Sequence, residues 1–233
     1  MSRARLAKKM IAELLASPAW RERADEIIAM GLAGVNALFS FLPKDALTKH
    51  SAALCMGRAV AALAQGEPEA ARNIVRRLMW HMNEDSGNIG WGIPEAFGEI
   101  LAASEVLAEQ YGNILISYIM RLPGADNYCD NALLRRSCYW AVGRLAEARP
   151  GLAHKARPWL ARGLEDEDVV CRGMAAWALA RLKPDIMLMP ALRRLAEAGH
   201  PEPCVLFDGE NVFERSVNAL AREAFEKIQD SSL

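Results

Sequence analysis

The sequence predicts an all-α protein: a right-handed α-α superhelix of about five helix pairs that follow an extra N-terminal helix. Three observations support this fold class. A segment around Trp140 recurs around Trp177, weaker copies extend the repeat with a period of about 40 residues, and the alternating runs and hairpin turns typical of strands are not found. Helical repeats of this length stack into solenoids, because one pair alone cannot bury its apolar face.

The clearest repeat joins LLRRSCYWAVGRL, residues 133–145, to VVCRGMAAWALARL, residues 169–182. With an offset of 37 residues, five positions are identical: Arg135 and Arg172, Trp140 and Trp177, Ala141 and Ala178, Arg144 and Arg181, Leu145 and Leu182. Weaker copies extend the series through equivalent points at Gly57, Gly98, Gly143, Ala180 and Ala221. The spacings between these points are 41, 45, 37 and 41 residues.

Helical patterns between these copies make each unit a helix pair. One example is the apolar face formed by Ile74, Val75, Leu78, Met79 and Met82. We expect a single repeat domain with a cap helix over residues 3–16 and units near residues 18–66, 67–110, 111–149, 150–184 and 185–229. Two outer helices should be kinked near their starts, because proline removes a backbone hydrogen bond there; the residues are Pro158 and Pro190.

The composition is that of a globular chain without a strong overall electric field. Apolar residues make up 52% and charged residues 24%, and 28 Lys and Arg nearly balance 29 Asp and Glu, which argues against nucleic acid as a partner. Glu13 interrupts the N-terminal apolar run, so we interpret this run as a helix and not an export signal. No run approaches the roughly 18 apolar residues of a membrane span. We expect a cytoplasmic protein without disulfides or a cysteine-rich zinc site, since its five cysteines are widely spaced.

The segment LEDEDVVCRGMAAWALARL, residues 164–182, resembles a HEAT-like repeat of the short type found in phycobilin-lyase-like proteins. The shared pattern is an Asp, then Val and Arg, then an Ala-rich second helix. The stretch at residues 83–100 is similar to a segment of a small uncharacterised bacterial family of such proteins, which implies no activity. The resemblance also implies that Asp166 or Asp168, together with Arg172 and Arg135, bonds between neighbouring units.

The inner helices carry two stripes of residues along their length. One stripe is small and apolar in every unit and packs the helices together, whereas the residue types of the second stripe vary from unit to unit. Inner helices line the concave groove of a solenoid, so the variable stripe is the expected binding surface. Trp and Arg, which are frequent at binding hot spots, are prominent in it. Two structural alternatives remain open: the tryptophans can belong to the core, and the arginines can cap helix ends or pair with Glu99. The candidate residues are Trp91, Glu95, Glu99, Trp140, Arg144, Trp177, Arg181, Arg58 and Arg222.

The stretch MNEDSGNIGWGIPEAFGEI, residues 82–100, contains a turn that is several residues longer than the turn at residues 165–168, so its glycines are an insertion. We expect its acids to form a negative spot beside Trp91 in an arginine-bearing groove. Glu95 and Glu99 stand one helical turn apart and could hold a hard cation or act as acid and base. Acids in a first helical turn are also ordinary partners of the helix dipole, and we predict no metal site. The loop candidates are Asn83, Glu84, Asp85 and Ser86.

No complete catalytic constellation is found: the sequence has no P-loop, no H-E-x-x-H and no nucleophile elbow. The leading hypothesis is therefore a non-enzymatic interaction or scaffold module, without a cofactor, that binds a protein or peptide in its concave groove. The alternative is a DNA-binding protein related to the HEAT-like alkylpurine DNA glycosylases, which need a positive potential that Glu95 and Glu99 would weaken. A bilin-lyase-like or regulatory role rests on fold analogy alone.

Overall fold

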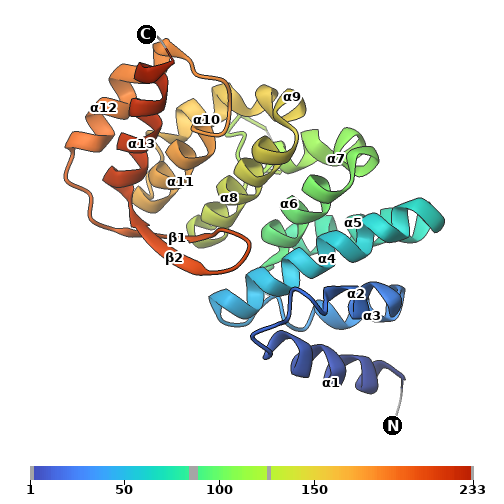
Figure 1. The fold of residues 1–233 in the computed structure, drawn as a ribbon. Coiled ribbons are helices and arrows are strands. Elements are labelled where there is room, and N and C mark those ends of the chain that lie inside the picture. The colour runs from blue at the N-terminus through green and yellow to red at the C-terminus, as the bar shows by residue number, and fades with distance from the viewer. Residues whose placement is uncertain (1–2, 84–88, 125–126, 232–233) are drawn as a thin grey trace. The chain divides into compact units, whose positions relative to one another are not determined.

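The structure is a computed structural model that describes residues 3–83, 89–124 and 127–231 (Figure 1). Helices dominate the described residues, as the sequence predicted, and one β-hairpin accompanies them. The chain divides into two compact units. The first unit comprises Met1–Gln110 with Asp208–Asn211, and the second comprises Tyr111–Phe207 with Val212–Leu233. The expected single repeat domain stays a prediction.

The first unit contains a long central helix packed against one later helix. Its elements are α1 (Arg3–Leu15), α2 (Ala24–Ala29), α3 (Leu32–Leu38), α4 (Ala46–Gly66), α5 (Pro68–Met82), α6 (Ile93–Ala103) and the start of α7 (Glu105–Ser117). Helices α4 and α6 lie side by side (Figure 1). A Cβ at Gly57 would lie 2.7 Å from the carbonyl oxygen of Glu99, so glycine permits the close approach of the two helices.

Local signals set the helix starts in this unit. The side chain of Asp45 accepts a hydrogen bond of 3.1 Å from the backbone N–H of Thr48 and caps α4. Pro68 occupies the first turn of α5, where a missing N–H costs no helical hydrogen bond. Gly92 precedes α6 with φ of 77°, and a Cβ there would collide with the carbonyl of Leu42. A glycine is therefore required at the end of the insertion.

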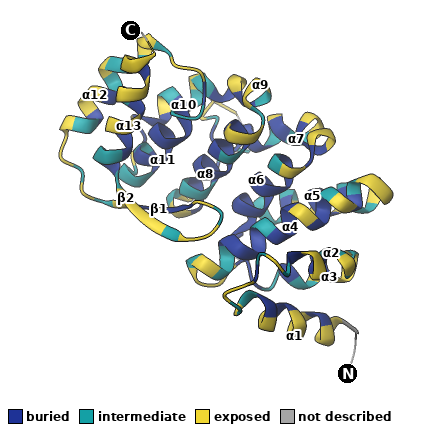
Figure 2. Ribbon diagram, viewed as in Figure 1, coloured by how far each residue is buried: buried dark blue, intermediate teal, exposed yellow. Residues whose placement is uncertain are grey.

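The second unit is built around a helix that packs on two others. Its elements are the end of α7, then α8 (Ala132–Ala148), α9 (Pro150–Ala153), the 3-10 turn η1 (His154–Ala156), α10 (Arg157–Gly163), α11 (Val169–Leu179), the 3-10 turn η2 (Ile186–Leu188), α12 (Met189–Glu197) and α13 (Val217–Asp230). Helix α11 packs against both α8 and α13. Most residues of α8 and α11 are buried (Figure 2). Side chains of Asn131, Asp168 and Ser216 cap α8, α11 and α13.

The prolines that were expected to kink two outer helices lie instead at the starts of helices. Pro158 and Pro190 each lie in the first turn of a helix, α10 and α12. A 3-10 turn precedes each of these helices, η1 before α10 and η2 before α12. Proline is tolerated in a first turn because its N–H would have no helical partner there, so the backbone breaks before the proline and does not bend after it.

The prediction that the chain contains no strands was wrong for one segment. Strands β1 (Pro203–Phe207) and β2 (Val212–Ser216) form an antiparallel hairpin, with Val205 opposite Glu214. The side chain of Asp208 accepts hydrogen bonds from the backbone N–H groups of Glu210 and Asn211. The Asp-Gly pair at residues 208–209 is a hairpin signal that could have revealed this turn.

Candidate functional site

The two tryptophans of the predicted groove stripe are core residues. Trp140 is 2% exposed and Trp177 is 4% exposed. Their rings are stacked with centroids 6.3 Å apart and planes 9° from parallel. A Cβ at Gly143 would overlap the ring of Trp177, so this glycine makes room for it. The placement of Trp140 and Trp177 among the groove candidates was wrong, and the core alternative that the sequence left open is confirmed, because both rings are buried and stacked on each other.

Two stripe arginines of the second unit, Arg144 and Arg181, form ion pairs with one carboxylate. Arg144 and Arg181 lie 2.6 Å and 2.7 Å from the two oxygens of Glu147. Arg181 also donates a hydrogen bond of 2.7 Å to the carbonyl of Trp177 near the end of α11, and its guanidinium lies 3.6 Å from the Trp177 ring centroid. The capping alternative is thus confirmed for Arg181, whereas the pairing alternative was wrong about the partner of this arginine, which is Glu147 and not Glu99. Arg58 and Arg222 are exposed.

The two acids of α6 do not form an exposed negative spot. Glu95 and Glu99 are 1% and 5% exposed. The Nζ of Lys49 lies 2.5 Å from Oε1 of Glu95, so a neighbouring cation balances that charge. The expected negative groove surface was therefore wrong for Glu95 and Glu99. Asn83 is exposed at the end of α5, whereas Glu84, Asp85 and Ser86 lie outside the described residues.

In the described part of the chain, no group of three or more His, Cys, Asp or Glu side chains is arranged to hold a metal ion. Among the same residues, no helix is both long and apolar enough to cross a membrane.

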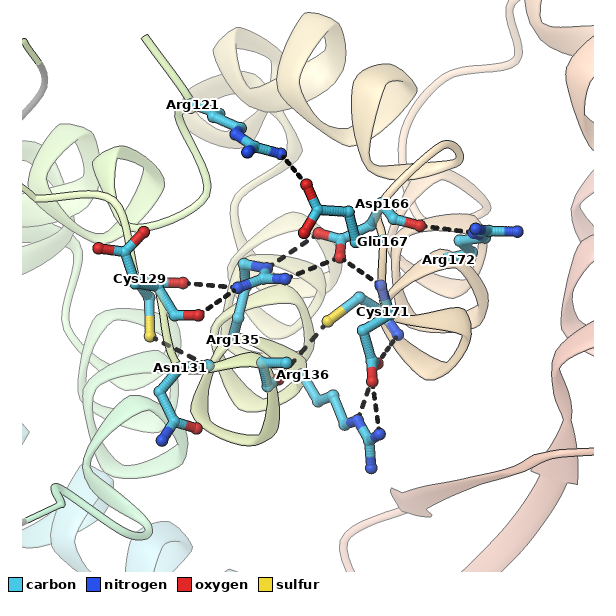
Figure 3. Close-up of polar contacts among 12 residues, drawn as sticks. Arg121, Cys129, Asn131, Arg135, Arg136, Asp166, Glu167, Cys171 and Arg172 are labelled. Carbon is cyan, nitrogen blue, oxygen red and sulfur yellow. Dashed lines mark hydrogen bonds and ion pairs between the residues drawn. The ribbon is translucent and has the colours of Figure 1, made fainter. Parts of the chain in front are cut away.

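The predicted Asp and Arg contacts between repeats are present in the second unit (Figure 3). Arg135 binds the carboxylate of Asp166 with two parallel hydrogen bonds of 2.9 Å and 2.8 Å. Arg172 donates a hydrogen bond of 2.6 Å to the backbone carbonyl of Asp166. Arg136, which was not among the predicted partners, holds Asp168 in the same two-pronged way at 2.9 Å and 2.6 Å. Since all of these contacts join the turn before α11 to α8 or to α11 itself, the network holds two repeats together.

The candidate binding site lies in the first unit, where one pocket combines exposed aromatic residues with an arginine. Its volume is about 380 Å³. Helix α3 and the residues after it form one wall, the end of α5 forms the second, and the turn before α6 forms the third. The lining residues are Asn36, Phe39, Ser40, Pro43, Arg77, His81, Ile89, Gly90, Trp91 and Ile93.

One wall of the pocket is an ordered aromatic and cationic cluster. The Cζ of Arg77 lies 3.8 Å from the ring centroid of Phe39. The Nη1 of Arg77 donates a hydrogen bond of 3.0 Å to Oδ1 of Asn36. The ring of His81 lies 5.9 Å from that of Phe39 and packs edge-on against Trp80 at 5.0 Å. Stacking and hydrogen bonding together hold the guanidinium in one orientation.

Another wall is a short turn that presents apolar side chains to solvent. Trp91 and Ile89 are each 39% exposed, and Trp80 beyond the rim is 60% exposed. The backbone N–H of Trp91 donates a hydrogen bond of 2.8 Å to the carbonyl of Ile89, and this bond tightens the turn. A Cβ at Gly90 would lie 2.9 Å from the carbonyl of His81, so the turn packs closely on the end of α5. Trp91 is thereby held at the pocket and not on a loose loop.

A second pocket, of about 260 Å³, lies in the second unit between α11 and α12. It is lined by Arg172, Arg194, Glu165 and His200, among others. Arg194 lies 3.8 Å from Glu165, and the Nε of Arg172 donates to the backbone carbonyl of Asp166. Its charges are largely satisfied within the protein, so the pocket beside Trp91 is the stronger candidate.

Of the predicted site residues that the structure describes, Trp91 alone lines the pocket in the first unit. Phe39 and Arg77 were missed because they lie 38 residues apart and only packing brings them together. The sequence signal that pointed to this candidate pocket was the glycine-rich insertion that carries Trp91.

Comparisons with known proteins agree with this architecture. A family model described as a HEAT-like repeat matches residues 132–182. An uncharacterized protein of Archaeoglobus fulgidus is 28% identical over 196 residues, which cover 82% of this chain and 95% of that protein. Among solved structures, a designed armadillo repeat protein in complex with the peptide (KR)4 has a TM-score of 0.51 and 15% identity, covering 94% of this chain and 98% of that one.

A further solved structure is an archaeal HEAT-like repeats protein from Thermococcus onnurineus NA1, with a TM-score of 0.37, 10% identity and coverage of 96% of this chain and 97% of that one. The similarity to the designed protein concerns the fold alone. Residues 132–182 therefore carry a HEAT-like repeat, and the chain is a mostly helical α-solenoid of HEAT/armadillo-like repeats.

Proposed function

We propose that this protein is a non-enzymatic interaction module that binds a segment of a partner polypeptide. The observation that carries the proposal is the pocket beside Trp91, where exposed apolar side chains meet a positioned arginine. Tryptophan and arginine are the residue types that most often dominate binding energy at interfaces. Solenoid repeats commonly present such residues to extended peptides.

The pocket is suited to binding because its walls are already ordered. Arg77 is fixed by Phe39 and Asn36, and the Trp91 turn is fixed against α5. A partner segment would therefore lose less free energy to ordering the site than it would on a flexible loop. The pocket volume of about 380 Å³ is sufficient for a small group of side chains but small for a large cofactor.

Binding along the inner helices, as the sequence suggested, remains a proposal of its own. Trp140 and Trp177 take no part in it, since both are buried. Arg58 in the first unit and Arg222 in the second are among the exposed residues of that stripe. We assign the primary contact to the Trp91 pocket because it has volume, apolar area and an arginine in one place.

Selection of a displayed random peptide library on the full-length protein tests the proposal. The affinities of enriched peptides are then measured by fluorescence anisotropy for the wild type, Trp91→Ala and Trp159→Ala. Trp159 is a partly exposed tryptophan of the second unit and serves as the matched control. We expect peptides that bind the wild type and the control equally and lose at least about tenfold in affinity with Trp91→Ala.

Two results would count against the proposal. One is a selection that enriches no peptide above the level found on a surface without protein. The other is a set of peptides that bind Trp91→Ala as well as they bind the wild type, which would place the contact elsewhere.

The DNA-binding alternative has no structural observation in its favour. The net charge is −1, and Arg144 and Arg181 are both engaged by Glu147. An electrophoretic shift with duplex DNA at low salt tests it, since phosphate contacts are strongest there. Similarity to phycobilin-lyase-like proteins and membership of a small bacterial family stay predictions. Absorbance after mixing with a bilin would test whether a chromophore binds.

A further inference from the structure

The charge on the pocket walls indicates what kind of peptide fits. Of the described lining residues, Arg77 is cationic, His81 can be, and none carries a carboxylate. The apolar residues of the lining include Ile93, which is buried, and Pro43, Ile89 and Trp91, which are exposed. The pocket thus offers one cationic donor group beside apolar surface.

Arg77 differs from the other two arginines of its helix. Arg72 and Arg76 both pair with Glu69, at 2.6 Å and 3.5 Å. Among the described residues, no carboxylate lies within ion-pair distance of Arg77, whose hydrogen bond goes to the neutral amide of Asn36. A guanidinium has five N–H groups, and stacking on Phe39 uses none of them. Several donors of Arg77 therefore remain available for an anion.

The orientation of Arg77 favours a planar anion. The Phe39 ring holds one face of the guanidinium, and Asn36 holds one Nη1 hydrogen, so the fork of donors is directed before a ligand arrives. A carboxylate accepts two parallel hydrogen bonds from such a fork. Because the arginine is already ordered, little side-chain entropy is lost on binding.

We propose that the pocket binds a peptide segment in which an Asp or Glu is followed or preceded by an apolar residue. The side-chain carboxylate binds Arg77, and the apolar side chain packs against Trp91 and Ile89. This inference rests on the proposed function and adds the chemistry of the ligand. A basic segment would bring like charge against Arg77, and a wholly apolar one would make no use of its donors.

Defined peptides test the proposal. The tightest peptide from the library selection is synthesised in four forms: unchanged, with each Asp or Glu replaced by Asn or Gln, with an amidated C-terminus, and with a phosphoserine in place of the acid. Binding is measured for full-length wild type, Arg77→Gln, Arg77→Lys and Arg76→Gln. Arg76 is the control, since it is adjacent, exposed and paired with Glu69. Circular dichroism and Tm confirm that each variant is folded.

The proposal predicts a specific coupling between peptide and protein. Arg77→Gln should weaken the acidic peptide about 10- to 100-fold, and Arg76→Gln should leave it nearly unchanged. Arg77→Lys should retain part of the affinity, because it keeps the charge but not the fork. The peptide without its acid should bind the wild type weakly and respond little to Arg77→Gln, which makes the two effects non-additive.

Failure of this inference is distinguishable from failure of the proposed function. Peptides that depend on Trp91 but carry no acid, or that ignore Arg77→Gln, would overturn the carboxylate proposal and leave peptide binding intact. If only amidation of the C-terminus lowers the affinity, the anion that binds Arg77 is the chain terminus. If the phosphoserine form binds much more tightly, the anion is a phosphate. Either result would overturn the proposed side-chain carboxylate. If no peptide depends on Trp91, the proposed function itself fails.

Discussion

Arg135 and Asp166 form a buried, two-pronged ion pair between the helix of one repeat and the turn of the next (Figure 3). Their side chains are 6% and 4% exposed. Arg135 also donates to the backbone carbonyls of Cys129 and Asp130, at 2.9 Å and 3.0 Å. The pair therefore secures both the adjacent repeat and the segment that leads into α8.

Removal of the carboxylate at Asp166 should strongly destabilise the protein. Asp166→Ala leaves the buried guanidinium of Arg135 uncompensated, and we expect a loss of about 3–5 kcal/mol in the free energy of unfolding. The neighbouring exposed pair of Arg121 and Glu167, at 2.8 Å, gives the control: Glu167→Ala should cost less than about 1 kcal/mol. Urea denaturation followed by circular dichroism measures both, and equal effects would contradict the structural role of the buried pair.

Gly143 should not tolerate even a methyl group. An alanine Cβ at this position would overlap the Trp177 ring, which is itself packed on Trp140, so Gly143→Ala should cost about 1–3 kcal/mol or more. Gly151, in α9, has no atom within 4 Å of the place that an alanine methyl group would occupy, and its φ is not positive. Gly151→Ala should therefore be neutral or stabilise the protein by up to about 1 kcal/mol. Thermal unfolding of the two variants tests this contrast, which fails if they shift Tm alike.

Substitution of a buried tryptophan and of a partly exposed one should have opposite effects on stability and on peptide binding. Trp140→Ala removes a fully buried ring from a stack and should cost about 3–5 kcal/mol. Trp91→Ala removes a partly exposed ring and should cost about 1 kcal/mol or less, while it should weaken peptide binding by at least about tenfold. Chemical denaturation and peptide affinity are measured on the same preparations. A stable, binding-deficient Trp140→Ala protein would restore the groove interpretation of that residue.

Stability should fall at mildly acidic pH because of His50. Burial lowers the pKa of His50 to about 4, from an ordinary value of 6.5, although nearby Glu95 opposes this and Lys49 adds to it. Between these two values the unfolded chain binds a proton that the folded chain does not, so the His50 contribution to stability is complete above pH 6.5 and is lost as the pH falls toward 4. The loss should reach about 3 kcal/mol.

A difference measurement isolates this histidine from the other titrating groups. The free energy of unfolding is measured from about pH 4 to about pH 7.5, a range that spans both pKa values, for the wild type, His50→Gln and His154→Gln. His154 is exposed and serves as the control. His50→Gln should flatten the profile within that window, and an unchanged slope would show that His50 is protonated without cost.

Cysteine labelling should follow burial and local hydrogen bonding. Burial raises the pKa of the Cys55 and Cys204 thiols to about 12, whereas a hydrogen bond with Cys138, assisted by Arg135, lowers the pKa of Cys129. The thiolate is the reactive form, so iodoacetamide should label Cys129 first in the native protein. Peptide mass spectrometry at increasing times measures the order, and all five cysteines should react in denaturant. Earlier labelling of Cys55 or Cys204 would contradict it.

Much of the fold could be predicted because its signals are local. The apolar periodicity of residues such as Leu78, the caps at Asp168 and Ser216 and the small residues at Gly57 and Gly143 each act within a few turns of chain or at one recurring position. The hairpin escaped prediction because its strands are five residues long and only one of them has a buried face. Its Asp208-Gly209 turn was the one strong signal.

The candidate site was less predictable because exposure depends on neighbours far away in the sequence. A variable stripe on a helix can indicate a binding surface or an unusual core, and periodicity is the same in both cases. Packing decided that Trp140 and Trp177 cover each other, that Glu147 engages Arg181, and that Lys49 reaches Glu95. The partners in each of these pairs come from different helices or, for Arg181, from the turn that follows α11.

The resemblance to HEAT-like repeats implied Asp and Arg contacts between repeats, and the sequence by itself determined that this protein is a helical repeat chain with a lengthened turn within residues 82–100. Periodicity and spacing carry that information, since each repeat must bury the same face. Only the tertiary structure decided which tryptophans are core and which are exposed, and only it placed Arg77 over Phe39 beside Trp91. The physical reason is that burial and charge pairing arise from side chains that meet through folding, at separations that no local pattern records.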